Sequence, residues 1–225
     1  VPSDDLSQGL VPSGTPITFE TDYPASKAII NSKEDLEQEG NTFKVFAWFD
    51  GTTDGHMFGE EGTDVTFTND KGWTYSPVRY WMNGTYDFSA VYSSTVNPRT
   101  EGASPTLTVP DFDVTSQEDL LIAFNNDIDG NNHPDKVDLT FKHALSNIQI
   151  QLSLDKNDFF ELDQSGNIVN QVGYAFVSLI GFEDISTKAT LTATSFENMI
   201  WTSAERGNQM LSYADNMPEI KAEWM

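Results

Sequence analysis

The chain contains no cysteine, few basic residues and no long apolar run. Without cysteine it has no disulfide bond, no thiolate zinc site and no cysteine nucleophile. Its 12 lysines and arginines stand against 35 aspartates and glutamates, which gives a formal net charge of -23. Binding to nucleic acid or to an anionic membrane surface needs clustered cations, so the composition argues against both partners. No apolar run approaches the ~20 residues of a membrane-spanning helix.

Catalytic motifs are missing as well. His56, His133 and His143 lie far apart without metal-binding spacing, and no nucleophile-elbow motif occurs. No nucleophile, base and orienting residue can be named together, so we expect no enzyme, no catalytic residue and no cofactor. Val1 does not resemble a natural start, and we expect a mature or trimmed chain whose export signal has been removed.

The residues that are abundant predict an all-β protein. Threonine, serine, asparagine, aspartate and phenylalanine are frequent, and no long amphipathic helical pattern appears. The sequence FKVFAWF (Phe43–Phe49) is apolar on both faces, as expected of a central strand that is covered on both sides. One or two helical turns are expected in Asn31–Gly40, with Ser32 and Asp35 as a capping box and Gly40 as the stop.

We expect a flexible leader over residues 1–16 and then two β-sandwich domains, residues 17–132 and 133–225. The polar loop Asn125–Asp135 is the expected boundary. Within Val137–Leu154 the apolar residues move from odd to even positions, although a strand has a strict period of two. A bulge, bend or break is therefore predicted at Lys142–Ser146.

The stretch Gly72–Tyr92 holds seven aromatic residues, and it allows two interpretations. Trp73, Tyr80 and Trp81 could form a platform for sugar rings, which makes a surface glycan-binding module one alternative function. Strand alternation sends about half of the rings inward in any case, and large aromatic residues are buried more often than displayed. We therefore expect most of these rings to lie in a core.

A second alternative function is a calcium-stabilised adhesin domain. Asn125, Asp127 and Asp129, followed by Gly130, match the first half of a calcium-binding loop. Lys136 occupies the position of the bidentate glutamate that would complete the loop. A solvated loop between strands is the preferred interpretation of this segment.

An ordered set of short motifs resembles the fimbrillin family, whose members are the subunits of type V pili in Bacteroides-type anaerobes. The resemblance covers about Ile17–Leu154 and is closest to the broad fimbrillin-like branch. The motifs are, in order, KEDL (Lys33–Leu36), FKVFAWF, the Trp73–Tyr75 pair, SPVRYW (Ser76–Trp81), YDFSAVY (Tyr86–Tyr92), DLLIAF (Asp119–Phe124) and LTFKHALS (Leu139–Ser146).

This resemblance implies two β-sandwich domains, the first transthyretin-like, on a lipoprotein precursor exported through the outer membrane to the cell surface. It implies that a protease removes an N-terminal segment and that a strand of another subunit fills the groove, which is β-augmentation at an open sheet edge. The candidate displaced strand comprises Ile17, Thr18, Phe19 and Glu20. The implied partners are other pilus subunits and host or bacterial surface ligands, with membrane attachment only through a lipid anchor on the precursor.

Three features depart from the family pattern. The lipobox cysteine is absent, no arginine lies near Val1 to mark the activating cleavage, and the second domain is short. Ile220–Met225 does not resemble a clear donor strand. We therefore expect a stalk, tip or accessory subunit, or a chain that is truncated in its second domain.

Overall fold

The computed structural model describes residues 14–23, 32–51, 55–93, 95–100, 105–116, 118–146, 160–171 and 180–211. Most of the expected leader, the end of Val137–Leu154 and the segment Ile220–Met225 lie outside these residues. The chain divides into two compact units, residues 1–146 with 186–205 (unit 1) and residues 147–185 with 206–225 (unit 2). No helix among the described residues has the length and apolar character needed to cross a membrane.

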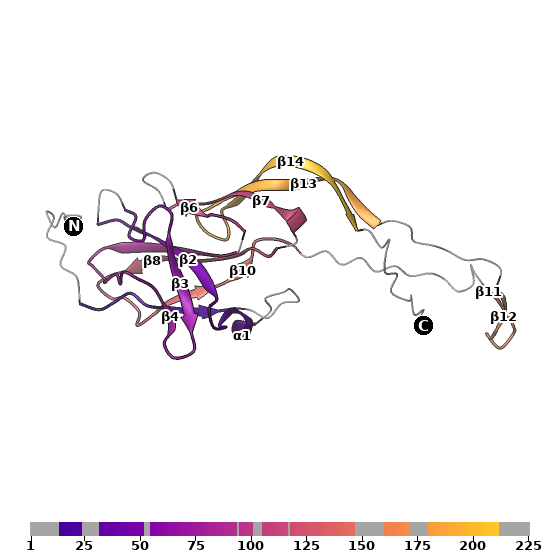
Figure 1. Cartoon of the computed structure of the whole chain (residues 1–225), viewed down its shortest axis with the longest axis horizontal. Helices are drawn as coiled ribbons and strands as arrows, with labels where there is room; N and C mark the ends of the chain where they lie inside the picture. The colour runs from indigo at the N-terminus through magenta and orange to yellow at the C-terminus, as the bar shows by residue number, and fades with distance from the viewer. Residues whose placement is uncertain are drawn as a thin grey trace. The chain divides into compact units, whose positions relative to one another are not determined.

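The regular elements of unit 1 are almost all β-strands, which confirms the all-β prediction. Its largest sheet has six strands in the order β10-β8-β5-β2-β3-β4 (Figure 1). Their bounds are β2 Thr42–Phe49, β3 Thr63–Thr68, β4 Gly72–Thr74, β5 Thr85–Tyr92, β8 Leu121–Asp129 and β10 Lys142–His143. The paired strands of this sheet run antiparallel.

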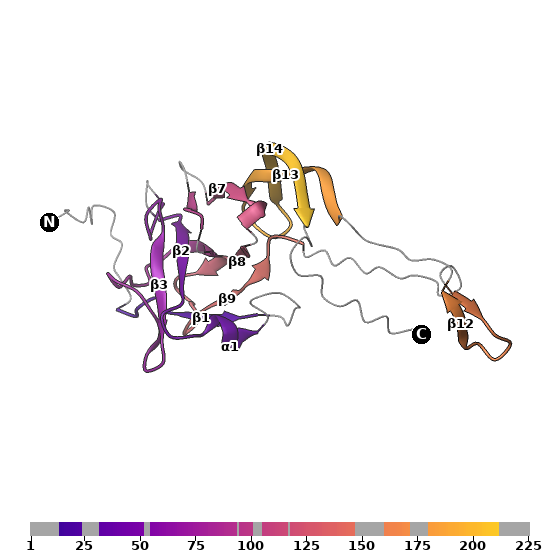
Figure 2. The same cartoon turned by 45° about the vertical axis from the view of Figure 1, so that its right-hand side comes forward.

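Each face of the six-stranded sheet is covered by a smaller sheet. On one side, β1 (Phe19–Asp22) pairs in parallel with β9 (Val137–Thr140), and the two strands run side by side in Figure 2. The sheet on the other side has the order β14-β13-β7-β6, with β6 Arg99–Thr100, β7 Leu107–Asp113, β13 Ile180–Ala193 and β14 Met199–Leu211. Of β13 and β14, only residues 186–193 and 199–205 belong to unit 1 and to this layer. A 3-10 turn, Val114–Ser116, follows β7.

The central strand β2 supplies side chains to both cores, as its sequence predicts. Phe43, Val45, Ala47 and Phe49 belong to the core beneath β1 and β9, whereas Phe46 belongs to the core beneath β7 and β13. β2 pairs with β3 on one edge and β5 on the other, so its main chain is satisfied inside the sheet. The first of these apolar layers is the one against which β1 packs, through Phe19.

The predicted helical turn is present as α1, Lys33–Leu36, but its predicted stop is wrong. The Ser32 hydroxyl accepts a hydrogen bond from the Asp35 N–H (3.1 Å), which confirms Ser32 as the N-cap. The helix ends four residues before Gly40. The reason is the Asn41 side chain, whose amide donates to the carbonyl oxygens of Asp35 and Leu36 at 3.0 Å each. A polar side chain thus ends the helix where a glycine was expected.

The loop predicted at Asn125–Asp135 is also wrong in its first half. β8 continues to Asp129, because Ile128 and Asp129 pair with Tyr86 and Thr85 of β5. The register shifts between Tyr86 and Phe88, and such a bulge lets polar residues extend the ladder. The domain boundary expected after residue 132 stays a prediction, although Val137 and Leu139 pack in the core of unit 1.

The break predicted within Val137–Leu154 is confirmed in the residues that the structure describes. β9 ends at Thr140, where it is paired with β1, and β10 begins at Lys142, where it pairs with β8. The change of partner strand falls at the buried Phe141, one residue before the predicted range Lys142–Ser146, and the apolar residues of even phase at 148–154 lie outside the described residues.

The described part of unit 2 includes a hairpin of β11 (Phe160–Leu162) and β12 (Ile168–Gln171). Asp163 holds its turn by accepting hydrogen bonds from the N–H groups of Ser165 (2.8 Å) and Asn167 (2.9 Å). Hydrogen bonds from Asn167 lower the pKa of the Asp163 carboxyl. Asx turns of this kind fix the reversal between two short strands.

Tyr86 supplies a prediction about alkaline stability. Burial raises its pKa to about 12, while a hydrogen bond with the Met82 backbone opposes the rise and the Asp50 charge adds to it. The folded state therefore keeps its proton at a pH where the unfolded chain, with a tyrosine pKa of about 10, has lost it. Stability falls as pH rises from about 10 towards 12, at up to about 1.4 kcal/mol per pH unit for one group.

We expect Tyr86→Phe to lower stability at pH 7 by about 1 kcal/mol, because the hydroxyl hydrogen bond is lost. The same variant should lose stability less steeply between pH 10 and 12. Urea unfolding midpoints measured across this range for both proteins check the effect, and parallel curves would contradict it.

Candidate strand-docking site

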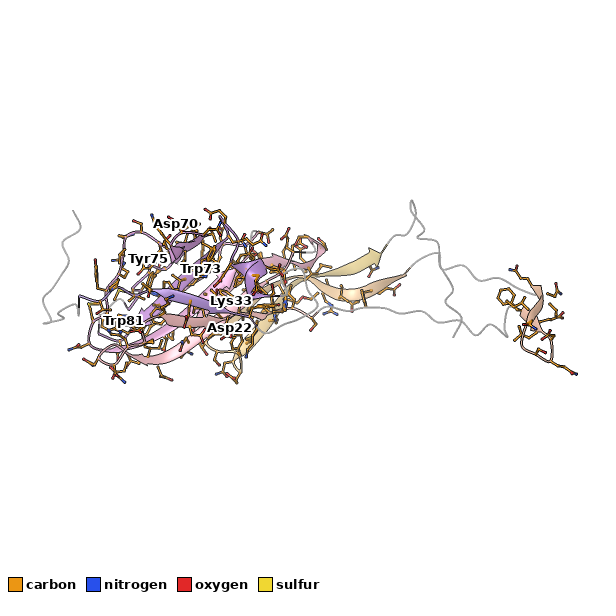
Figure 3. All side chains as sticks on the ribbon, turned by 90° about the horizontal axis from the view of Figure 1, so that it is seen from below. Asp22, Lys33, Asp70, Trp73, Tyr75 and Trp81 are labelled. Carbon is orange, nitrogen blue, oxygen red and sulfur yellow. The ribbon has the colours of Figure 1, made fainter. Side chains whose placement is uncertain are left out.

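The N-terminal segment of unit 1 inserts every second side chain into the core. Ile17, Phe19, Thr21 and Tyr23 are 0%, 3%, 1% and 6% exposed, whereas Glu20 and Asp22 are exposed. This is the period of two that an extended strand imposes. The segment therefore occupies four successive inward positions, and we call residues 17–23 the docked segment. Figure 3 places Trp81 towards one end of it and Asp22 and Lys33 towards the other.

Phe19 occupies the aromatic centre of these four positions. Its ring centroid lies 5.6 Å from Tyr75, 5.8 Å from Phe58, 6.1 Å from Phe88 and 6.3 Å from Phe43. The rings meet edge-on or tilted, the arrangements that aromatic quadrupoles favour. Four elements of unit 1 thus close around a single side chain of the docked segment.

Thr21 occupies a polar inward position. The indole Nε1 of Trp73 donates to the Thr21 hydroxyl at 3.0 Å, and that hydroxyl donates to the Glu37 carboxylate at 2.9 Å. Glu37 also pairs with Lys33 at 3.7 Å. Buried donors need a partner, so Thr21 satisfies an indole that would otherwise have none inside the core.

The main chain of the docked segment is hydrogen-bonded along both of its edges. On one side the Val137 N–H donates to the Thr18 carbonyl (2.8 Å) and the Phe141 N–H donates to the Asp22 carbonyl (2.9 Å). On the other side the Ile17 N–H donates to the Arg79 carbonyl (2.8 Å), and just before the segment the Trp81 N–H donates to the Thr15 carbonyl (3.0 Å). Removing the segment would leave an open edge on each side of the groove it fills.

Tyr23, the last residue of the docked segment, belongs to a network of hydrogen bonds between side chains. Its hydroxyl bonds to Nε2 of His143, and Nδ1 of His143 lies 2.9 Å from a carboxylate oxygen of Asp119. The rings of Tyr23 and His143 meet edge to face at 5.6 Å. The docked segment is thereby joined to β10 and to the residues that precede β8.

The sequence predicted only the first part of this site. It placed the candidate displaced strand at Ile17, Thr18, Phe19 and Glu20, whereas β1 spans Phe19–Asp22 and the burial pattern continues to Tyr23. Thr21 was missed because a hydroxyl at an inward position interrupts the apolar alternation. The period of Ile17, Phe19 and Tyr23, with threonine as a good strand former, is the signal that could have found it.

The structure does not bring the candidate glycan platform together on one surface. Trp73 is 8% exposed and Trp81 0%, while Tyr80 is 45% exposed. Trp81 stacks on His133 at 4.9 Å, and its buried Nε1 has no hydrogen-bond partner among the residues that the structure describes. Among the aromatic residues of Gly72–Tyr92, Tyr86 and Phe88 are buried as well, so the prediction that most of these rings lie in the core is confirmed.

The three residues of the calcium half-loop lie on β8. The Asn125 side chain donates to the Asp138 carbonyl, the Asp127 N–H donates to Asp87, and Asp129 accepts from the Asn131 N–H. Each is therefore engaged in strand or turn contacts. Within the described ranges, no group of three or more His, Cys, Asp or Glu side chains is placed to hold a metal ion.

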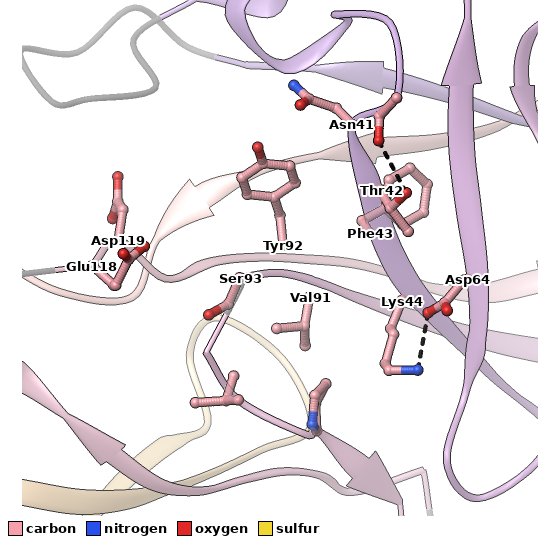
Figure 4. A pocket seen from close by; sticks show the side chains of 13 residues that line it. Asn41, Thr42, Phe43, Lys44, Asp64, Val91, Tyr92, Ser93, Glu118 and Asp119 are labelled. Atoms are coloured by element: carbon pink, nitrogen blue, oxygen red, sulfur yellow. Dashed lines mark hydrogen bonds and ion pairs between the residues drawn. The ribbon is translucent and has the colours of Figure 1, made fainter. Parts of the chain in front are cut away.

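A cavity of about 420 Å³ lies between the start of β2 and the end of β5 (Figure 4). Lys44 and Asp64 form an ion pair across part of its wall at 2.9 Å. Tyr92, Glu118 and Asp119 also line it, and burial followed by the Glu118 charge raises the pKa of Tyr92. The lining mixes apolar and polar side chains, and its lysine is already paired with a carboxylate.

The comparisons with known proteins give one family. A fimbrillin-like family model matches residues 30–217 of the chain. Neither the search of curated proteins nor the search of solved structures found a significant match to the chain.

Proposed function

Because this chain belongs to the fimbrillin-like family, we propose that it is a pilus subunit that assembles by donor-strand exchange. The family is one of structural pilus subunits, which indicates a cell-surface fimbrial location and assembly with other subunits. In the proposal, the docked segment holds the place that a strand of another subunit takes in the fibre.

The observation that carries the proposal is the burial pattern of the docked segment. A short segment near the N-terminal end of the described chain fills four inward positions and is hydrogen-bonded along two edges. A strand from another molecule can use the same main-chain bonds and the same side-chain positions, which is the chemistry of β-augmentation. The aromatic lining around Phe19 supplies most of the apolar surface that a new strand would bury.

We place the activating cleavage between the docked segment and α1, in residues 24–31. In the proposal, cleavage releases the chain up to Tyr23 and retains α1. The helix is retained because Glu37, its C-cap residue, contributes a carboxylate to the groove. Lys27 is the first basic residue of the sequence and lies in this interval. Lys27 is therefore a possible cut for a trypsin-like protease in this interval.

The proposal is tested with a full-length chain that carries a site-specific protease sequence inserted within residues 24–31. After cleavage we expect oligomers that resist dissociation in detergent, formed with itself or with co-expressed pilus subunits, and detected by size-exclusion chromatography and gel mobility. A chain with a scrambled recognition sequence, treated identically, is the control and should stay monomeric. Monomers in both samples, with no complex to any pilus subunit, would show that the polymerisation proposal is wrong.

The finer family features belong to the same proposal. We propose that residues 17–132 and 133–225 form two β-sandwich domains, the first transthyretin-like, and that the precursor is a lipoprotein with a role in adhesion. The complete precursor sequence tests the export route directly. A lipobox cysteine upstream of Val1 supports it, and a precursor without one would remove the lipid anchor from the proposal.

A further inference from the structure

The outward face of the docked segment carries negative charge against a negative neighbour. Glu20 and Asp138 are direct partners in the parallel register of β1 and β9, and Asp22 follows two residues later on the same face. All three side chains are exposed. Like charges placed opposite each other weaken a strand pair, so β1 is a poor electrostatic match for the edge on which it lies.

The charges around Asp138 support this assessment. Partial burial, followed by the charges of Glu20 and Asp22, raises the pKa of the Asp138 carboxyl, and Lys33 opposes the rise. Lys33 is itself paired with Glu37 at 3.7 Å. The charge of Asp138 is therefore penalised in the folded chain as long as β1 is its neighbour.

The inward face imposes a second requirement. At the Thr21 position the groove offers the Trp73 indole N–H as a donor and the Glu37 carboxylate as an acceptor, and one hydroxyl group serves both. An aliphatic side chain there would leave the buried indole N–H of Trp73 without its acceptor, and Glu37 would keep only its ion pair with Lys33. The Phe19 position, by contrast, is lined by rings and accepts an aromatic side chain.

We infer that the strand of the partner subunit carries a lysine or arginine opposite Asp138 and a threonine or serine at the position of Thr21. This inference rests on the proposed strand exchange and adds the chemistry of the incoming strand. The cation replaces a repulsive pair with an attractive one, and the hydroxyl keeps the buried indole satisfied. The inward side chains of β1 then fit the groove, whereas its outward carboxylates repel Asp138. This repulsion favours replacement of β1 by the strand of the partner subunit.

The test uses the full-length chain with the cleavage site in residues 24–31 and fluorescent peptides of residues 14–23. Four peptides are compared by anisotropy after cleavage, namely the native sequence, Glu20→Lys, Glu20→Gln and Thr21→Val. At low salt we expect the Glu20→Lys peptide to bind about fivefold more tightly than the native one, with Glu20→Gln in between. The Thr21→Val peptide should bind about tenfold more weakly.

Two controls identify the cause. In the Asp138→Asn chain the preference for the Glu20→Lys peptide should shrink towards onefold, and in the original chain it should diminish at 0.5 M salt because exposed charges are screened. A second measurement needs no cleavage. In the intact chain Glu20→Lys should raise Tm by a few degrees, and Asp138→Asn should remove most of that gain.

The outcomes distinguish the requirements on the incoming strand from strand exchange itself. If the native peptide exchanges but the lysine peptide shows no preference, or keeps its preference in Asp138→Asn, the charge requirement is overturned and strand exchange stands. Equal binding of the Thr21→Val peptide would overturn the hydroxyl requirement. If no peptide replaces the cleaved segment, both the inference and the proposed function fail.

Discussion

Replacing Phe19 by alanine is expected to cost about 3–5 kcal/mol of stabilising free energy, the usual range for deleting a buried phenyl ring. The ring is 3% exposed and contacts Phe43, Phe58, Tyr75 and Phe88, so its removal leaves a cavity between strands of the main sheet and the loops above it. Because the docked segment lies near one end of the described chain, the loss should appear first as detachment of that segment. Hydrogen exchange at residues 15–23 should therefore accelerate before the six-stranded sheet opens.

Phe112→Ala is the matched control for this prediction. Phe112 is 1% exposed and belongs to the core on the other face of the main sheet, with the ring of Trp201 at 6.3 Å. Its removal should lower the urea unfolding midpoint by a similar amount while exchange in residues 15–23 follows global unfolding only. If Phe19→Ala leaves exchange in the docked segment unchanged, the segment is not held by that ring and the groove has been assigned incorrectly.

Gly130→Ala should destabilise unit 1 by about 3 kcal/mol, at the upper end of the range for overpacking. A Cβ atom at this position would lie 2.0 Å from the Met82 carbonyl oxygen and 2.8 Å from the Tyr86 ring. The Gly130 N–H also donates to the Gly84 carbonyl at 2.8 Å, so a backbone shift that relieves the contact strains this bond. The loop that follows β4 and the turn that follows β8 are packed main chain to main chain here.

Gly59→Ala separates this steric effect from the ordinary cost of replacing a glycine. Gly59 has φ +80, and no atom of the described residues lies within 4 Å of the position that an alanine Cβ would take. Alanine there should therefore cost only about 1–2 kcal/mol, for the left-handed backbone. Thermal unfolding of both variants gives the comparison. A Gly130→Ala protein as stable as Gly59→Ala would contradict the close packing of the two turns.

Local patterns correctly predicted the elements that depend on residues close together in the sequence. FKVFAWF is apolar on both faces, and β2 is indeed central and contributes to both cores. Ser32 caps α1 because the contact spans only three residues. The change of phase after Phe141 predicted a break because a strand cannot alter its period. Each of these signals is complete within a few neighbouring positions.

Predictions failed where a residue outside the local pattern supplies the partner. Asn125–Asp129 has the composition of a loop but forms the end of β8, because it pairs with the main chain of β5. Gly40 has the composition of a helix stop, yet Asn41 ends α1 earlier by reaching its last carbonyls. Trp73, Tyr80 and Trp81 could each have faced solvent or core, and only packing separates the exposed Tyr80 from the two buried indoles.

Residue types and their spacing establish the all-β class, the acidic character, the fimbrillin-like family and the outline of a strand at Ile17–Glu20. The surroundings of that strand come from the folded chain, in which Thr21 lies between Trp73 and Glu37 and Glu20 lies opposite Asp138. Alternation and capping depend on neighbours a few positions along the chain. The partners of the Thr21 hydroxyl, by contrast, lie 16 and 52 residues away, and Asp138 is brought opposite Glu20 by pairing between two strands that are distant in sequence.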